Sequence, residues 1–158
     1  MGRICATLGG ACFAVSLAAG LAIPGSAVSA PLPAAKYYQG TAKTTCYGSA
    51  ALYCYVTLPA VPADKVLTVA SVDCSATVVA STGTPFVASA GISSPEDPVI
   101  AMKPELTYAD AQKRFYVIHH DGDFFVSPGR APSAYMITQG TLKQAELSCA
   151  VIGRLSVP

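Results

Sequence analysis

The 158-residue sequence predicts an all-β fold, an antiparallel β-sandwich or jelly roll stapled by two disulfides and preceded by a cleaved signal peptide. Short runs rich in Val, Thr, Tyr, Phe and Ile alternate with clusters of Gly, Pro, Ser and Asp, which is typical of strands and turns. The part of the chain beyond the N-terminal segment keeps an even number of cysteines. No helical crossover of the kind that parallel strands need is visible, so we expect an antiparallel sheet.

Residues 1–27 predict a secretory signal peptide. Arg3 precedes an uncharged apolar run over residues 4–23, and small residues follow that run, in the order of a charged, an apolar and a cleavage region. Cleavage after Ala27 or Ala30 fits, but the second would leave Pro31 directly beyond the cut bond, so we favour Ala27. An uncleaved membrane anchor is the alternative reading, because about twenty apolar residues can span a bilayer.

Residues 28–36 predict a flexible lead, and residues 37–158 predict a single β-sandwich domain. Without Arg3, the chain has 10 − 1 = 9 basic and 9 acidic residues, a formal charge of zero with no basic stripe. We therefore expect no nucleic-acid partner. Charged residues make up only 12% of the chain, about half the usual share, so we expect Ser, Thr, Gly and Pro to cover much of the surface.

The expected strands are 37–47, 52–58, 66–72, 75–80, 98–103, 113–120, 123–127, 134–139 and 145–157, with 86–92 a weaker candidate. Loops are expected at 59–65, 81–85, 91–98 and 127–133, because each contains a Gly or Pro that ends a strand. One or two helical turns are expected from Thr107, since Asp110 falls at the capping-box position.

The four cysteines of the mature chain are Cys46, Cys54, Cys74 and Cys149. In a small exported domain an even set predicts two disulfides, whereas a metal site would need closer Cys or His spacing. Three pairings are possible. We predict Cys46–Cys54, because the Gly-Ser pair between them can turn a local hairpin, and Cys74–Cys149, which would then bridge distant strands.

Two segments carry a resemblance to other proteins, "KVLTVASVDC" at 65–74 and "AELSCAVIGRLSVP" at 145–158. The chain resembles small exported proteins of unknown function from soil and plant-associated alphaproteobacteria, in a strand that ends V-x-C and a last strand of the form C-x-x-x-G-x-L. The resemblance implies a β-sandwich and export over most of the mature chain. It brings no catalytic residues with it.

The run "HHDGD", His119 to Asp123, is the strongest polar cluster. Its imidazoles and carboxylates could ligate a metal or perform acid–base chemistry. However, Asp121-Gly122 between apolar runs predicts a type I′ hairpin, which would pair His120 with Asp123. Because strand side chains alternate, His119 would then point to the other face, together with Phe124 and Val126. We therefore predict a hairpin tip that holds no metal.

Tyrosine is abundant, with eight copies and no tryptophan. Tyr53 and Tyr55 share one strand face and could stack on a sugar or a peptide, although half-buried packing is the commoner role of such rings. Arg130 could clamp a carboxylate, although a solvated loop arginine is the commoner explanation.

The predicted function is non-enzymatic binding, or association with the cell envelope, by a secreted or periplasmic protein. The expected partner is an unknown protein or glycan at the cell exterior, with no cofactor and no membrane span after signal cleavage. Loops 91–98 and 127–133 are the expected contacts, because their prolines limit the entropy lost on binding. The alternative is a small periplasmic hydrolase or metal-dependent protein that uses His119, His120, Asp121 and Asp123.

Overall fold

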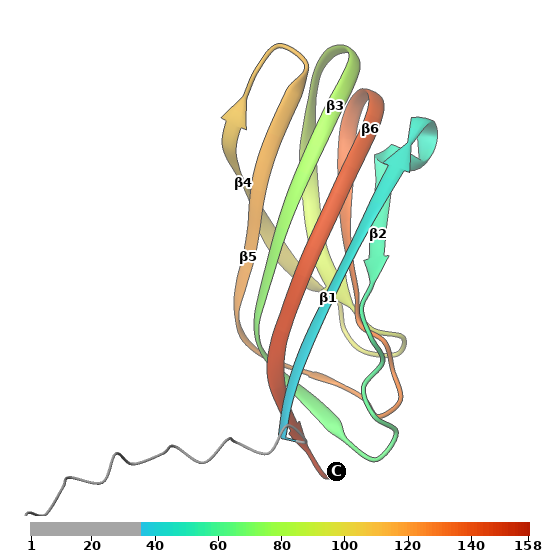
Figure 1. The fold of residues 1–158 in the computed structure, drawn as a ribbon, viewed down its shortest axis with the longest axis vertical. Coiled ribbons are helices and arrows are strands. Elements are labelled where there is room, and N and C mark those ends of the chain that lie inside the picture. Colours follow the sequence, from blue (N-terminus) through green and yellow to red (C-terminus); the bar gives the residue numbers. More distant parts are fainter. Residues whose placement is uncertain (1–35) are drawn as a thin grey trace, which may run out of the picture. The chain divides into compact units, whose positions relative to one another are not determined.

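The computed structural model describes residues 36–158 as an antiparallel sheet of six strands (Figure 1). Its elements are β1 (Tyr37–Tyr47), the 3-10 helix η2 (Gly48–Leu52), β2 (Tyr53–Thr57), β3 (Val66–Ser93), β4 (Ile100–Ala109), β5 (Lys113–Val126) and β6 (Ser133–Ser156). Every strand pair is antiparallel, so the predicted all-β class is confirmed. The predicted signal peptide, and the lead up to residue 35, lie outside the described residues.

The two longest strands, β3 and β6, pair with each other from Val66 opposite Ser156 to Ser93 opposite Ser133. Both strands arch over at the top of Figure 1. The arch lies at Gly83 and Gly140, whose φ angles of 72° and 111° favour glycine. The prediction of a loop at 81–85 was therefore wrong, because β3 stays extended through the bend and its pairing with β6, interrupted after Thr82, resumes at Phe86. Several of the short strands expected from the sequence merge into β3 and β6 for the same reason.

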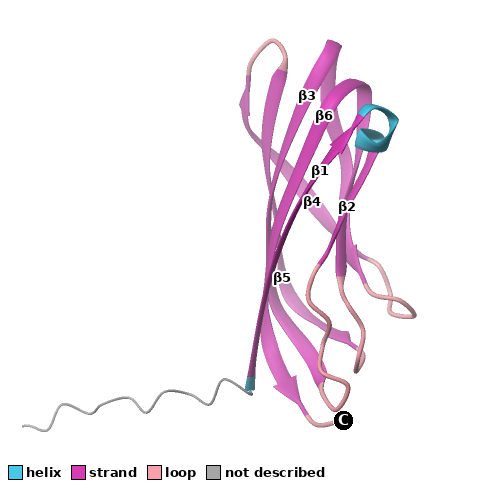
Figure 2. Cartoon of the chain, turned by 45° about the vertical axis from the view of Figure 1, so that its right-hand side comes forward, coloured by secondary structure: helices cyan, strands magenta, loops and turns pink. Residues whose placement is uncertain are grey.

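Because the β3–β6 ribbon bends back on itself, the sheet forms two layers (Figure 2). In the first layer, the strand order is β1, β6 (141–156), β3 (66–80), β5 and the last part of β4. In the second layer, β2 pairs with β6 (133–139), which pairs with β3 (86–93) and through it with the start of β4. The inner faces of the two layers enclose the core.

Alternate residues of the long strands fill this core. The largest fully buried side chains come from both layers and include Leu67, Ile92, Ile118, Met136 and Leu147. The ring of Tyr38 is buried as well, and its hydroxyl donates a hydrogen bond to the carbonyl of Pro59 at 2.5 Å. This bond gives the one polar atom of the ring a partner inside an apolar environment.

Among the described residues, no helix is long and apolar enough to cross a membrane.

Both predicted disulfides are confirmed. Cys74 and Cys149 are direct neighbours on β3 and β6, with their Cα atoms 4.1 Å apart. Cys46 is bonded to Cys54, but the local hairpin expected between them was wrong. β1 and β2 pair with different halves of β6, and η2 joins them at the top of Figure 2. The Cys46–Cys54 bond therefore links the two layers.

The helical turns expected from Thr107 were wrong too. β4 runs on to Ala109, and Asp110 closes a tight turn into β5. Its carboxylate accepts hydrogen bonds from the backbone N–H groups of Gln112 at 2.8 Å and Lys113 at 2.6 Å, and these bonds hold the pKa of Asp110 below its ordinary value. A side chain suited to capping a helix serves this turn in the same way.

The hairpin predicted at Asp121-Gly122 was also wrong, because β5 continues as one strand past this point. His119 pairs with Asp73 of β3, and the register then shifts so that Phe124 pairs with Val69. Gly122 and Asp123 together oppose a single residue of β3, which is a β-bulge. The long run of backbone pairing between β3 and β5 outweighs the turn preference of Asp121-Gly122. Because the bulge changes the alternation, Phe124 and Val126 belong to the inner side and not to the face of His119.

Candidate functional site

The outer face of the second layer carries an exposed aromatic cluster. We call Tyr53, Tyr55, Tyr135 and Ile137 the tyrosine surface. Tyr53 lies opposite Ile137 and Tyr55 opposite Tyr135 in the β2–β6 register. Tyr53 is 54% exposed and Tyr55 is 58% exposed. The strand alternation that the sequence predicted for Tyr53 and Tyr55 therefore places both rings toward solvent.

The rings of this surface lie close together. Tyr53 and Tyr135 have ring centroids 5.7 Å apart and planes within 24° of parallel, and Tyr55 lies 6.2 Å from Tyr53. Tyr135 reaches across to β3 at Gly91, where a Cβ atom would lie 2.7 Å from the Tyr135 hydroxyl oxygen. The bare glycine therefore makes room for this ring, and three neighbouring strands hold the surface in place.

Hydroxyl groups extend the tyrosine surface along the same face. The Oγ1 atom of Thr57 and the Oγ atom of Ser133 lie 3.2 Å apart in the next pair of the β2–β6 register, and Ser93 of β3 lies opposite Ser133. None of the residues of β2, 133–139, 86–93 and 100–102, the described strands of this layer, is charged. The face combines aromatic rings with neutral hydrogen-bonding groups.

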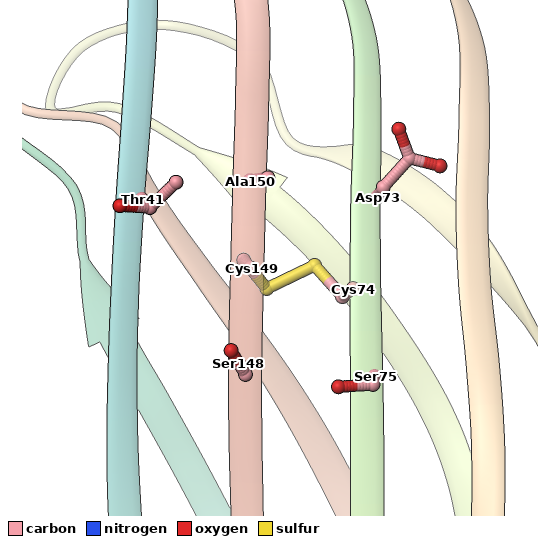
Figure 3. Close-up of a pocket in the computed structure, with 7 residues that line it drawn as sticks. All are labelled: Thr41, Asp73, Cys74, Ser75, Ser148, Cys149 and Ala150. Atoms are coloured by element: carbon pink, nitrogen blue, oxygen red, sulfur yellow. A yellow bond between two sulfur atoms is a disulfide. The ribbon is translucent and has the colours of Figure 1, made fainter.

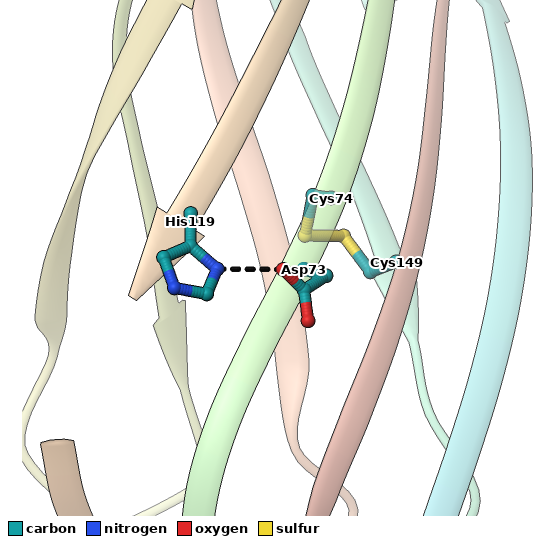
Figure 4. Close-up of a disulfide and its surroundings, with 4 residues drawn as sticks. All are labelled: Asp73, Cys74, His119 and Cys149. Carbon is teal, nitrogen blue, oxygen red and sulfur yellow. Dashed lines mark hydrogen bonds and ion pairs between the residues drawn. A yellow bond between two sulfur atoms is a disulfide. The ribbon is translucent and has the colours of Figure 1, made fainter. Parts of the chain in front are cut away.

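A second cluster lies on the outer face of the first layer. The Nδ1 atom of His119 is 2.6 Å from Oδ1 of Asp73 (Figure 4). Its Nε2 atom is 2.8 Å from Oδ2 of Asp121. Sequence reasoning missed Asp73, which only the pairing of β3 with β5 brings to His119. Both carboxylates, with Asp121 the stronger influence, raise the pKa of the His119 imidazole above its ordinary value.

Neither His120 nor Asp123 is a hydrogen-bond or ion-pair partner of His119. His120 lies against Phe124, with ring centroids 6.2 Å apart, and Asp123 lies in the bulge. Both nitrogens of His119 face carboxylates, whereas a histidine that activates a hydroxyl nucleophile needs one nitrogen for that hydroxyl. Within residues 36–158, no group of three or more His, Cys, Asp or Glu side chains is arranged to hold a metal ion.

An open depression of about 320 Å³ adjoins Asp73 on the same layer (Figure 3). It lies between β1, β6 and β3, and the Cys74–Cys149 disulfide is part of its lining. The other lining residues have short side chains, Thr41, Ser75, Ser148 and Ala150 beside Asp73. Ligand pockets usually enclose most of a small molecule, and this depression is too open to do so.

Arg130 forms an ion pair within the chain. Its Nη2 atom lies 2.7 Å from Oε2 of Glu96. Beside this pair, Ser127 donates hydrogen bonds to the carboxylate of Asp97 through its backbone N–H at 3.3 Å and its hydroxyl at 3.0 Å. The two loops that the sequence predicted as ligand contacts are therefore bound to each other, and Arg130 already has a carboxylate partner.

Comparison with protein-family models, curated proteins and solved structures finds no match to this chain. The resemblance to exported alphaproteobacterial proteins therefore stays a prediction.

The ion pairs of His119 lead to a prediction about its titration. We expect NMR to show a His119 pKa above about 6.5, and Asp121→Asn to lower it more than Asp73→Asn does. When folding raises the pKa of a histidine, the protein gains stability at pH values below the pKa in the unfolded chain. This stability is lost as the pH rises through the pKa in the folded protein. His119→Gln should therefore lower Tm in mild acid and leave it unchanged at alkaline pH. A His119 that titrates at or below its ordinary value would contradict these contacts.

Proposed function

We propose that this chain is an exported, non-enzymatic binding protein, and that the tyrosine surface is its contact with a ligand outside the cytoplasm. The observation that carries the proposal is the cluster of three tyrosines on adjacent strands of one uncharged face, with Tyr53 and Tyr55 more than half exposed. Contiguous exposed aromatic groups on a soluble domain commonly mark a surface that a partner covers.

The two disulfides support the export part of this proposal. Bonds such as Cys46–Cys54 and Cys74–Cys149 form and persist in oxidising compartments. Together with the signal peptide predicted for residues 1–27, they favour a secreted or periplasmic location.

The build of the surface supports a binding role. Tyrosine offers a large, rigid contact area and has only two side-chain torsions to order. Tyr135 packs over Gly91, and Tyr53 packs against Tyr135. Rings that are already ordered lose little entropy when a ligand binds, which raises affinity for a given contact area.

The alternative, a small hydrolase, is supported by one observation. His119 between Asp73 and Asp121 is an exposed acid–base group. Because both of its nitrogens face carboxylates, it offers no free nitrogen to a nucleophile unless one ion pair opens. We therefore place the hydrolase second.

The test is binding of the oxidised protein to an array that carries both oligosaccharides and peptides. Tyr53→Ala and Tyr135→Ala should each weaken binding at least about tenfold, as expected for contact residues of this type. Tyr108→Ala is the matched control, because Tyr108 is 55% exposed but lies on the part of β4 that belongs to the first layer. Binding that survives both tyrosine variants, or substrate turnover that His119→Ala abolishes, would contradict the proposal.

A further inference from the structure

We infer that the ligand of the tyrosine surface is an extended, uncharged glycan chain. This inference rests on the proposed function and names the class of ligand for the same surface.

The charge of the face favours a neutral ligand. The described strand segments of the second layer, β2, 86–93, 100–102 and 133–139, contain no Lys, Arg, Asp or Glu. Recognition of carboxylates or phosphates normally uses Arg or Lys. Cationic groups are bound by carboxylates or by aromatic cages, and the tyrosines here lie on an open sheet face and form no cage. A ligand with neither kind of charge fits this face best.

The chemistry of the face matches that of a sugar. A sugar ring has an apolar C–H side, which packs on an aromatic ring, and a rim of hydroxyls. The Tyr53 and Tyr135 rings stack with their centroids 5.7 Å apart, and the Tyr55 ring lies tilted beside Tyr53 at 6.2 Å, so the exposed sides of this cluster are available for such packing. The hydroxyls of Thr57 and Ser133 lie next to these rings. Each can donate and accept a hydrogen bond, as sugar hydroxyls require.

The size of the surface favours a narrow chain over a folded protein. A tyrosine offers about 150–250 Å² in total, and Tyr53 and Tyr55 are 54% and 58% exposed. The rings therefore supply a few hundred Å² of contact, and a folded protein would also have to cover the neighbouring residues, since a stable protein interface takes about 800 Å² from each partner. The contact is of a size that a few consecutive sugars would cover.

The arrangement across strands indicates contact with the interior of a chain and not only its end. Tyr55, Tyr135 and Gly91 lie side by side on β2, β6 and β3, on an outer face of the sheet. An oligosaccharide laid across these strands touches successive rings, so longer oligosaccharides should bind more tightly than disaccharides of the same sugar.

The experiment is calorimetric titration of the oxidised protein with hexasaccharides. The neutral probes are β-1,4-linked glucose, mannose and xylose hexasaccharides, and the comparison probes are an oligogalacturonate and an uncharged peptide of similar length. We expect at least one neutral hexasaccharide to bind, with little change on raising the salt concentration. Tyr53→Ala and Tyr135→Ala should weaken its binding at least about tenfold. Tyr135→Phe, which keeps the ring, should retain most of the affinity, and Tyr108→Ala should retain all of it.

Three results would overturn the inference. Tyrosine-dependent binding of only the oligogalacturonate or only the peptide would replace the glycan class and leave the proposed binding function standing. Neutral-glycan binding that Tyr53→Ala and Tyr135→Ala do not weaken would overturn the inference and the proposed surface together. A protein that binds none of the probes would overturn the inference as well.

Discussion

Replacing Cys74 and Cys149 together by alanine is expected to lower the free energy of unfolding by roughly 4 kcal/mol. The bond closes a chain segment of sequence separation 75, and on the chain-entropy model a long closed loop restricts the unfolded chain strongly. The matched control is the Cys46→Ala, Cys54→Ala double variant, whose cysteines are separated by only 8 positions. The same model gives about 2.5 kcal/mol for that shorter loop.

Urea unfolding of the oxidised protein and the two double variants measures both losses. A larger loss for the Cys46 and Cys54 variant would contradict the assumption that disulfides stabilise this protein mainly by restricting the unfolded chain. The stabilisation would then come from the link that Cys46–Cys54 makes between the two layers.

Ile118→Ala is the second change with a large expected effect. Ile118 is fully buried on β5, whereas its neighbour Val117 is 45% exposed on the opposite face. Truncating a fully buried isoleucine costs about 2–5 kcal/mol, through lost burial and the cavity that remains. Val117→Ala should change stability by only about 0.5 kcal/mol. Denaturant midpoints measure the pair, and similar losses at the two positions would contradict the face assignment of β5.

The local pattern of the sequence predicted much of the fold. The runs around 37–47 and 53–57 form strands because their β-branched and aromatic residues suit a pleated surface. The same alternation put Tyr53 and Tyr55 on one face. The predicted disulfide pairing is correct, but the local hairpin on which Cys46–Cys54 was predicted is absent, since β1 and β2 lie in different layers.

The errors arose where a distant strand outweighs a local signal. Gly83 and Asp121-Gly122 look like turns, but pairing with the neighbouring strand resumes just beyond each of them, so one becomes a bend and the other a bulge. Asp110 looks like a helix cap and closes a tight turn between strands. Turn residues show that the chain can bend at that point. Whether the strand ends there depends on whether its pairing with a neighbouring strand continues beyond the bend.

The candidate sites were predicted only in part for the same reason. Tyr135 follows Tyr55 by 80 positions, and nothing near either residue indicates that β6 runs beside β2. Asp73 joins His119 only through the pairing of β3 with β5. Residues that share a strand can be grouped from sequence, whereas residues on neighbouring strands need the topology.

The two outer faces of the sheet differ in chemistry. The first layer carries an ion pair between Lys43 and Glu146, whose Nζ and Oε1 atoms are 2.9 Å apart, in addition to the ion pairs of His119. The second layer carries the tyrosine surface on strands without charged residues. Exposed ion pairs contribute little to stability and keep a surface hydrated. The contrast favours the second layer as the face that a ligand covers and the first as the face that stays in solvent.

Mapping of amide chemical shifts by NMR tests most directly whether the tyrosine surface is the contact. The isotope-labelled, oxidised protein is titrated with the neutral hexasaccharide that binds it most tightly. The shifts are expected to cluster at Tyr53, Tyr55, Tyr135, Ile137 and the neighbouring Gly91, which share the outer face of the second layer. Shifts that cluster instead around His119 and Asp73, or in the loop of Arg130, would contradict the assignment.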